Sequence, residues 1–177
     1  ETITPGFLEE LRGVAADFFI VAAYAKILPA DLIGLPPRGA LGVHPSLLPK
    51  LRGTTPIQTA ILNGDKNAGT TIFLLDEKVD HGRILAQESI PVAGKNYIEL
   101  ARALAELSAE LLVKTLPRWE RGELAAVPQD ETQATFTKKF SAEDGCIPIE
   151  ELERAQQNNH SLAENIERKI RALNPEP

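Results

Sequence analysis

The nine residues "DFFIVAAYA", residues 17–25, indicate the fold class because they are apolar on both faces of an extended chain. A continuous apolar run between a charged residue and the exit "KILP" is typical of a strand that lies in a parallel sheet and is covered by helices on both sides. The segment before it, "GFLEELRGVAA", has apolar residues at helical spacing. A helix that leads into a strand of this kind predicts an α/β protein.

Residues 40–45, "ALGVHP", are predicted to form a second short strand that ends at a histidine. Open α/β sheets place their functional sites at such strand ends. The next segment, "TPIQTAILNGD", reads as a helix with Thr55 as its N-cap and Pro56 in its first turn. Residues 69–77 and 83–92 are β-type runs, and "KVDHG" between them suits a turn.

A long amphipathic helix is predicted over residues 96–122, because Leu100, Leu104 and Leu111 recur on one side of it. This helix should pack on the sheet, and Pro117 should kink or end its regular part. Beyond residue 127 the chain is polar, with one more helix expected at about residues 162–173.

The composition excludes several classes of protein. The chain has 177 residues and a net charge of -6, which argues against a stand-alone nucleic-acid binder, since phosphate neutralisation needs surplus Lys and Arg. One cysteine and three histidines allow neither an internal disulfide framework nor a Cys/His zinc site. No apolar run has the length of a membrane span. We therefore expect a cytoplasmic monomer without a bound metal.

Two side chains stand out as candidates for chemistry: His44 at a strand end and Asp80 in the turn. An imidazole can give or take a proton near pH 7, and a carboxylate bonded to it would fix its tautomer and support its charged form. The alternative is that His44 is a packed histidine and Asp80 a turn former. Spacing alone leaves both interpretations open.

The stretch "HPSLLPKLRGTTPIQTAILNGD" followed by "GTTIFLLDEKVDHGRIL" resembles the formyltransferases that use 10-formyltetrahydrofolate. This resemblance implies a Rossmann-like domain, with a mostly parallel sheet and flanking helices, that lacks its first βαβ portion before residue 1. It also implies a partial catalytic domain over residues 1–127 and a polar tail and linker over residues 128–177, toward a C-terminal domain outside this sequence.

The same resemblance assigns site residues. The family's catalytic His and Asp fall on His44 and Asp80, and its catalytic Asn falls on Gly42, which has no side-chain donor for a developing oxyanion. The family's folate-binding loop falls on four consecutive residues: Ser46, Leu47, Leu48 and Pro49. His81 stands where the family usually has a small polar residue, and we expect it to reshape the pocket.

The segments "VPQDETQATFTKKFSAEDGCI" and "RKIRALNPEP" resemble the branch of the family that formylates initiator methionyl-tRNA for translation initiation. Folate and this tRNA are the partners that the resemblance implies. Two alternatives stay open: a formyltransferase for a small amine, such as an amino sugar or glycinamide ribonucleotide, and a catalytically silent folate-binding relative. Arg52, with Lys50, either contacts a phosphate of the nucleic acid or belongs to a solvated loop.

Overall fold

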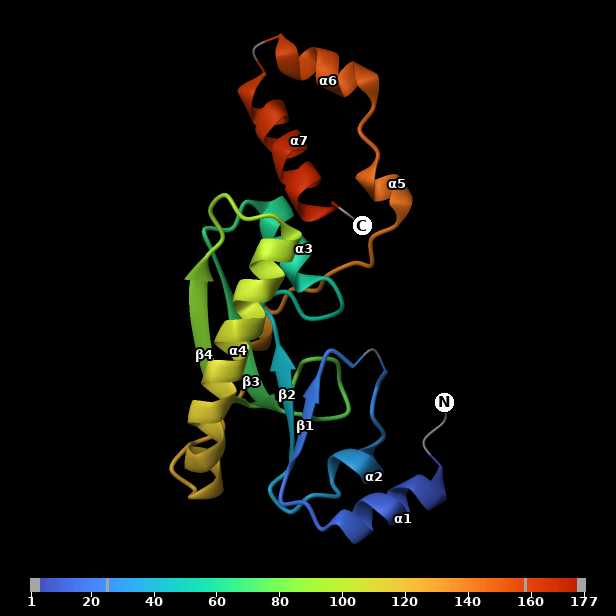
Figure 1. Cartoon of the computed structure of the whole chain (residues 1–177), viewed down its shortest axis with the longest axis vertical. Coiled ribbons are helices and arrows are strands. Elements are labelled where there is room, and N and C mark those ends of the chain that lie inside the picture. The colour runs from blue at the N-terminus through green and yellow to red at the C-terminus, as the bar shows by residue number, and fades with distance from the viewer. Residues whose placement is uncertain (1–3, 25, 158, 175–177) are drawn as a thin grey trace.

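The computed structural model describes residues 4–24, 26–157 and 159–174, and its centre is a four-stranded sheet with the order β1-β2-β3-β4 (Figure 1). The strands are β1 (Phe19–Ala22), β2 (Ala40–His44), β3 (Asn67–Leu74) and β4 (Ile84–Pro91). The helices are α1 (Pro5–Val14), α2 (Ala30–Ile33), α3 (Pro56–Asn63), α4 (Tyr97–Glu120), the 3-10 turn η1 (Glu131–Gln133), α5 (Ala142–Gly145), α6 (Ile149–Gln156) and α7 (His160–Ala172). Over the part of the chain described, no helix has the length and apolarity needed to cross a membrane.

The strand directions confirm the α/β class but change the expected kind of sheet. β1 pairs with β2 in parallel, whereas β2 with β3 and β3 with β4 are antiparallel pairs. The sheet of the described residues is therefore mixed rather than mostly parallel. The connection explains the second of these antiparallel pairs: β3 and β4 are joined by a short loop, and parallel neighbours would need a crossover of a dozen or more residues.

Helix α4 covers one face of the sheet. Its residue Leu111 packs with Leu41 of β2, Ile72 of β3 and Leu85 of β4 in one buried cluster. The helix begins at a capping box and continues through Pro117 to Glu120, so Pro117 does not end it. The proline removes only its own N–H bond to the carbonyl four residues earlier, and its carbonyl still accepts from the Arg121 amide at 3.1 Å, so the last turn continues.

The opposite face of the sheet carries the candidate site. Successive side chains of a strand point to opposite faces, so Gly42 and His44 of β2 face away from α4 when Leu41 faces toward it. Phe73, which pairs with Gly42 across the antiparallel ladder, lies on that same face. The loop from residue 45 to residue 53 lies over it, pinned by Thr71: its hydroxyl donates to the Ser46 carbonyl and accepts from the Leu48 amide.

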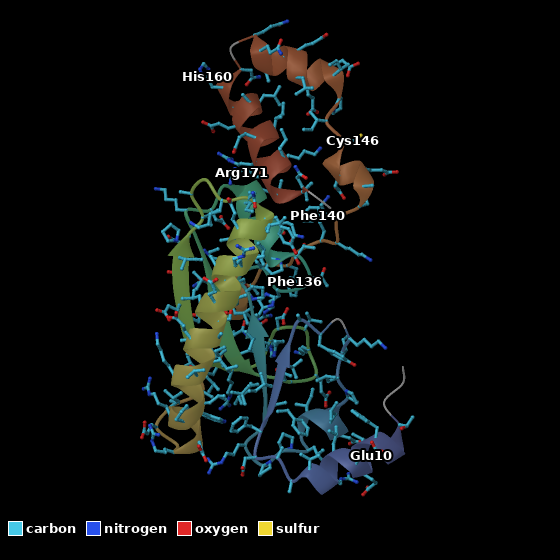
Figure 2. All side chains as sticks on the ribbon, in the orientation of Figure 1. Glu10, Phe136, Phe140, Cys146, His160 and Arg171 are labelled. Atoms are coloured by element: carbon cyan, nitrogen blue, oxygen red, sulfur yellow. The ribbon has the colours of Figure 1, made fainter. Side chains whose placement is uncertain are left out.

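The C-terminal tail packs onto the domain. Ala172 and Leu173, at the end of α7, are buried with residues of α3 and α4, and the Arg171 guanidinium donates to the Lys95 carbonyl just before α4 (Figure 2). The helix expected at about residues 162–173 is present as α7. The sequence did not predict η1, α5 or α6. The division of the chain at residue 127 stays a prediction.

Candidate active site

His44 ends β2 and is buried, with 6% of its surface exposed. Its Nε2 lies 2.9 Å from the Leu51 carbonyl oxygen, and its Nδ1 lies 3.5 Å from Oδ2 of Asp80. The two candidate side chains are therefore in contact, a point that the sequence left open. Because a carbonyl only accepts, Nε2 carries the proton in the neutral ring, and Nδ1 is protonated only in the imidazolium form. The tautomer is thus set by Leu51, and Asp80 faces the nitrogen that gains the second proton.

Asp80 is held in a backbone conformation that few residues adopt. Its φ is 47°, in the left-handed region, which aspartate tolerates better than most side chains. Its Oδ2 accepts a hydrogen bond from the Gly53 amide at 2.8 Å. About a fifth of the side chain, 19%, is exposed. The carboxylate is therefore fixed by one bond, faces His44 and still reaches the surface, as a group that exchanges protons with a substrate must.

Gly42 lies on the same face as His44, but the space over it is filled. A Cβ atom built on Gly42 would lie 2.4 Å from Cε1 of Phe73 and 3.0 Å from Cδ2 of Leu75. Phe73 is itself buried. An aromatic ring therefore occupies the volume into which a side chain at position 42 would project. Sequence reasoning missed Phe73, because its position over Gly42 depends on the register of β2 with β3.

The loop expected to bind folate is largely engaged with its own protein. Ser46 and Leu48 are buried, and the Ser46 hydroxyl donates to the Lys50 carbonyl at 2.6 Å. The Leu48 amide donates to Thr71, and the Leu48 carbonyl accepts from Gln87. These bonds use backbone groups that could otherwise hold a ligand.

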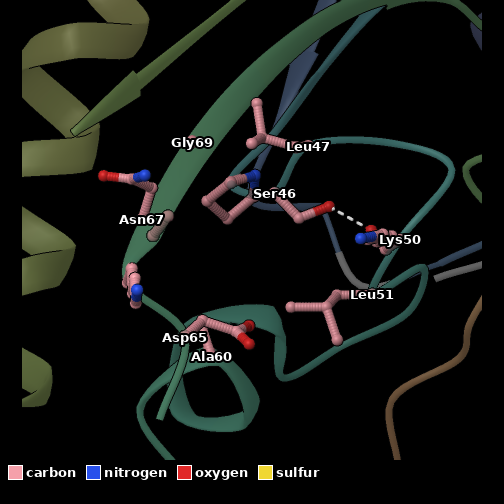
Figure 3. A pocket seen from close by; sticks show the side chains of 11 residues that line it. Ser46, Leu47, Lys50, Leu51, Ala60, Asp65, Asn67 and Gly69 are labelled. Carbon is pink, nitrogen blue, oxygen red and sulfur yellow. Dashed lines mark hydrogen bonds between the residues drawn. The ribbon is translucent and has the colours of Figure 1, made fainter. Parts of the chain in front are cut away.

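A cavity of about 220 Å³ lies beside this loop (Figure 3). Ser46, Leu47 and Gly69 line it together with Asp65, and burial raises the pKa of the Asp65 carboxyl above its ordinary value. Neither His44 nor Asp80 is among its lining residues. The cavity therefore adjoins the predicted loop without containing the predicted catalytic pair.

A second depression, of about 440 Å³, lies between α2 and the loop that follows β3. It is lined by Ala30, Ile33 and Gly34 of α2 and its end, and by residues 75–78. Val79, between these residues and Asp80, is an exposed large apolar side chain. The sequence predicted no site here, since nothing in the pattern brings residues 30–34 next to the turn.

Arg52 is neither a phosphate contact nor part of a solvated loop, so both sequence interpretations were wrong. Only 2% of it is exposed, and its guanidinium donates to both carboxylate oxygens of Glu131, at 3.0 and 2.6 Å, and to the Gln129 side-chain oxygen. A buried arginine needs such partners, and here they come from residues almost eighty positions along the chain. The hydrogen bond from Arg52 lowers the pKa of the Glu131 carboxyl below its ordinary value.

His81 joins two segments, and its expected effect on the shape of the pocket stays a prediction. Its Nδ1 lies 2.5 Å from Oδ2 of Asp76, and its Nε2 lies 3.5 Å from Oε1 of Glu131. Within residues 4–24, 26–157 and 159–174, no group of three or more His, Cys, Asp or Glu side chains is placed to hold a metal ion.

The chain is similar to several known proteins. Residues 2–116 match the family model described as Formyl transferase. The sequence is 45% identical over 141 residues to a methionyl-tRNA formyltransferase of Synechococcus sp. (strain JA-2-3B'a(2-13)), covering 79% of this chain and 44% of that protein. It is 40% identical over 174 residues to the one from Roseiflexus sp. (strain RS-1), covering 98% and 50%. The chain thus spans about half the length of the curated relatives it matches.

Solved structures share the fold at lower identity. HypX from Aquifex aeolicus in complex with tetrahydrofolic acid superposes with a TM-score of 0.79 at 22% identity, covering 96% of this chain and 28% of that one. A likely sugar N-formyltransferase from Mycobacterium tuberculosis superposes with a TM-score of 0.75, also at 22% identity, covering 94% and 67%.

Proposed function

This chain belongs to the formyl transferase family, and from that membership we propose that it transfers a formyl group from 10-formyltetrahydrofolate to the amino group of initiator methionyl-tRNA, in the cytoplasm. The observation that carries the proposal is the pair formed by His44 and Asp80, 3.5 Å apart at the end of β2. Relatives that match nearly the whole chain, at about 40% identity, are named methionyl-tRNA formyltransferases, whereas the sugar formyltransferases share the fold at about half that identity.

The proposed chemistry uses the two side chains in sequence. Asp80 accepts a proton from the attacking ammonium, so that the amine nitrogen can bond to the formyl carbon. In the imidazolium form, His44 keeps Nε2 on the Leu51 carbonyl and carries its second proton on Nδ1, beside Asp80. In this proposal Nδ1–H stabilises the oxyanion that develops on the formyl oxygen and passes its proton to the departing folate nitrogen. One C–N bond forms as another breaks. Between ammonium and formamide the amine nitrogen loses two protons: Asp80 takes the first and releases it to solvent, and the second replaces the proton that His44 gives to the folate nitrogen.

The folate needs a pocket with apolar walls, and the two cavities differ in how well they fit. Ligand pockets commonly measure about 300–1,000 Å³, a range that includes the depression of about 440 Å³ beside residues 75–78 but not the cavity of about 220 Å³ beside Ser46. The lining of the depression ends at Lys78, two residues before Asp80 in the chain. We therefore propose that the pterin lies there, and that the Ser46–Pro49 loop supports His44 and Leu51 from behind.

A reduced folate should consequently protect the amides of residues 75–79 from hydrogen exchange more than those of residues 46–48. The reason is that the first segment lines an open depression, whereas the second is already buried and hydrogen-bonded. Exchange would be measured by mass spectrometry with and without 5-formyltetrahydrofolate, and α7 serves as the unaffected reference. Protection concentrated at residues 46–48 would restore the loop as the binding site.

The proposed acceptor is tested by measuring how well the complete gene product formylates different amines. With 10-formyltetrahydrofolate as donor, methionyl-tRNA should be formylated with a higher kcat/KM than glycinamide ribonucleotide or a nucleotide-linked amino sugar. A preference for either small amine would replace the proposed acceptor by that alternative.

One observation favours a second candidate function, that of a folate-binding relative without transferase activity. Gly42 supplies no side-chain donor, and the ring of Phe73 fills the space beside it. Losing one oxyanion donor typically lowers the rate by about 10²- to 10³-fold. Folate binding in the exchange experiment, without formylation of any of the three amines, would establish this candidate.

A further inference from the structure

Residues 127–137, named here the strap, run from the start of β4 to the loop beside His44. At one end Val127 forms a bridge with Ile84, and at the other Phe136 forms a bridge with Arg52. The Arg52 amide donates to the Thr135 carbonyl at 2.9 Å, so the strap is bonded directly to the residue that precedes Gly53. Between these anchors the strap passes the turn that carries Asp80.

The side-chain amide of Gln129 is the point at which the strap meets that turn. Its Nε2 donates to the backbone carbonyls of Asp80, at 2.9 Å, and Gly82, at 2.8 Å. Its Oε1 accepts from Nη2 of Arg52 at 2.7 Å and from Nε at 3.2 Å. A guanidinium only donates, so Arg52 fixes which end of the amide faces it, and both amide hydrogens are directed to the two carbonyls.

The turn needs such a restraint because its backbone is strained and tightly packed. Asp80 has a left-handed φ of 47°. A Cβ at Gly82 would lie only 1.7 Å from the Leu74 carbonyl oxygen, which shows how closely the turn lies on the end of β3. Residues stay in such strained conformations when several contacts from the surrounding structure hold them there.

We propose that Gln129 is a positioning residue for Asp80: by bonding the carbonyls on both sides of His81, it holds the Asp80 carboxylate against the Gly53 amide and opposite His44. The inference rests on the proposed function, in which Asp80 exchanges a proton with the amine. Arg52 acts at both ends of this arrangement, because it orients Gln129 and directly precedes Gly53. Glu131 in turn neutralises Arg52 through two hydrogen bonds.

The test replaces Gln129 by alanine and reads out the Gly53 amide, which donates to Asp80 at 2.8 Å. In Gln129→Ala we expect the Gly53 amide to exchange about tenfold faster, the factor that corresponds to loss of about one hydrogen bond. The amides of α4 should keep their exchange rates. Gln133→Ala is the matched control, because Gln133 lies on the same strap but is exposed, and its side-chain amide donates to Asp130 rather than to the turn.

A kinetic cycle then separates positioning from general stability. Gln129→Ala should lower kcat with little change in KM for the folate, and it should cause no further loss in an Asp80→Asn background, because the residue acts through Asp80. Gln129→Met keeps the length of the side chain without its amide, so it provides the same measurements if the alanine variant does not fold.

The outcomes are distinct. Unchanged exchange at Gly53 in a folded Gln129 variant, or losses of kcat that add in the Asp80→Asn background, would overturn the positioning role. Faster exchange at Gly53 with unchanged kcat would support the contact and overturn the proposed catalytic role of Asp80 instead.

Discussion

Replacing Asp80 by asparagine should lower the rate of formyl transfer by about 10²- to 10⁴-fold, the contribution typical of a positioned proton-transfer group. Asparagine keeps the shape of the side chain and an oxygen that can accept from the Gly53 amide, so the turn should stay in place. It cannot accept the proton of the attacking ammonium or balance the charge of an imidazolium at His44. Single-turnover formylation of methionyl-tRNA by the complete gene product measures the effect.

The matched control is Asp17→Asn, because Asp17 is exposed and lies before β1, away from the site. It should leave the rate and the thermal midpoint unchanged. A folded Asp80→Asn variant with a rate close to that of the parent would show that the contact with His44 is structural, as in the interpretation of His44 as a packed strand-end histidine.

Gly42→Asn places a side-chain amide at position 42, and the packing around this position changes the result that we expect from the substitution. Because the family's catalytic Asn falls on Gly42, the resemblance by itself would imply that Gly42→Asn increases the rate. Because a Cβ at Gly42 would lie 2.4 Å from the Phe73 ring, the single substitution should instead lower the free energy of unfolding by about 1–3 kcal/mol, as overpacked cores do. Differential scanning calorimetry against Gly13→Asn provides the comparison, since a Cβ at Gly13 meets nothing within 4 Å.

The paired variant Gly42→Asn with Phe73→Ala should recover part of this loss, because the new side chain occupies the space that the ring vacates. Phe73→Ala alone should cost about 3–5 kcal/mol through the cavity it leaves. Relative to Phe73→Ala, the pair should transfer formyl about 10²-fold faster or more, as expected for one preorganised oxyanion donor. Folate affinity should change little, since the contact strengthens mainly in the transition state.

Two results would contradict this account. A Gly42→Asn variant as stable as the parent would mean that the Phe73 ring moves aside without cost. A stable pair that transfers formyl no faster than Phe73→Ala would place position 42 away from the oxyanion, and the silent folate-binding relative would then become the better interpretation.

Much of the fold follows from local sequence. The apolar runs predicted β1 and β2, and the leucine spacing predicted α4, because these patterns depend on neighbours within a few positions. The turn residues "KVDHG" predicted the hairpin connection that carries Asp80. The sequence also identified His44 and Asp80 as candidates for the site. His44 ends a predicted strand, Asp80 lies in a predicted turn, and both belong to motifs that resemble the family's.

Other features appear only in the folded chain. Arg52 is buried because Glu131 lies beside it, and Gln129 meets Asp80 across 49 positions of sequence. Phe73 covers Gly42 through strand pairing, and a register shifted by one residue would have turned another side chain to that face. A local pattern determines which way a side chain points within its own element. The partner that it meets there depends on how distant segments pack, and this arrangement decides whether an arginine is solvated, whether a glycine has room for a substituent, and which oxygen a histidine bonds.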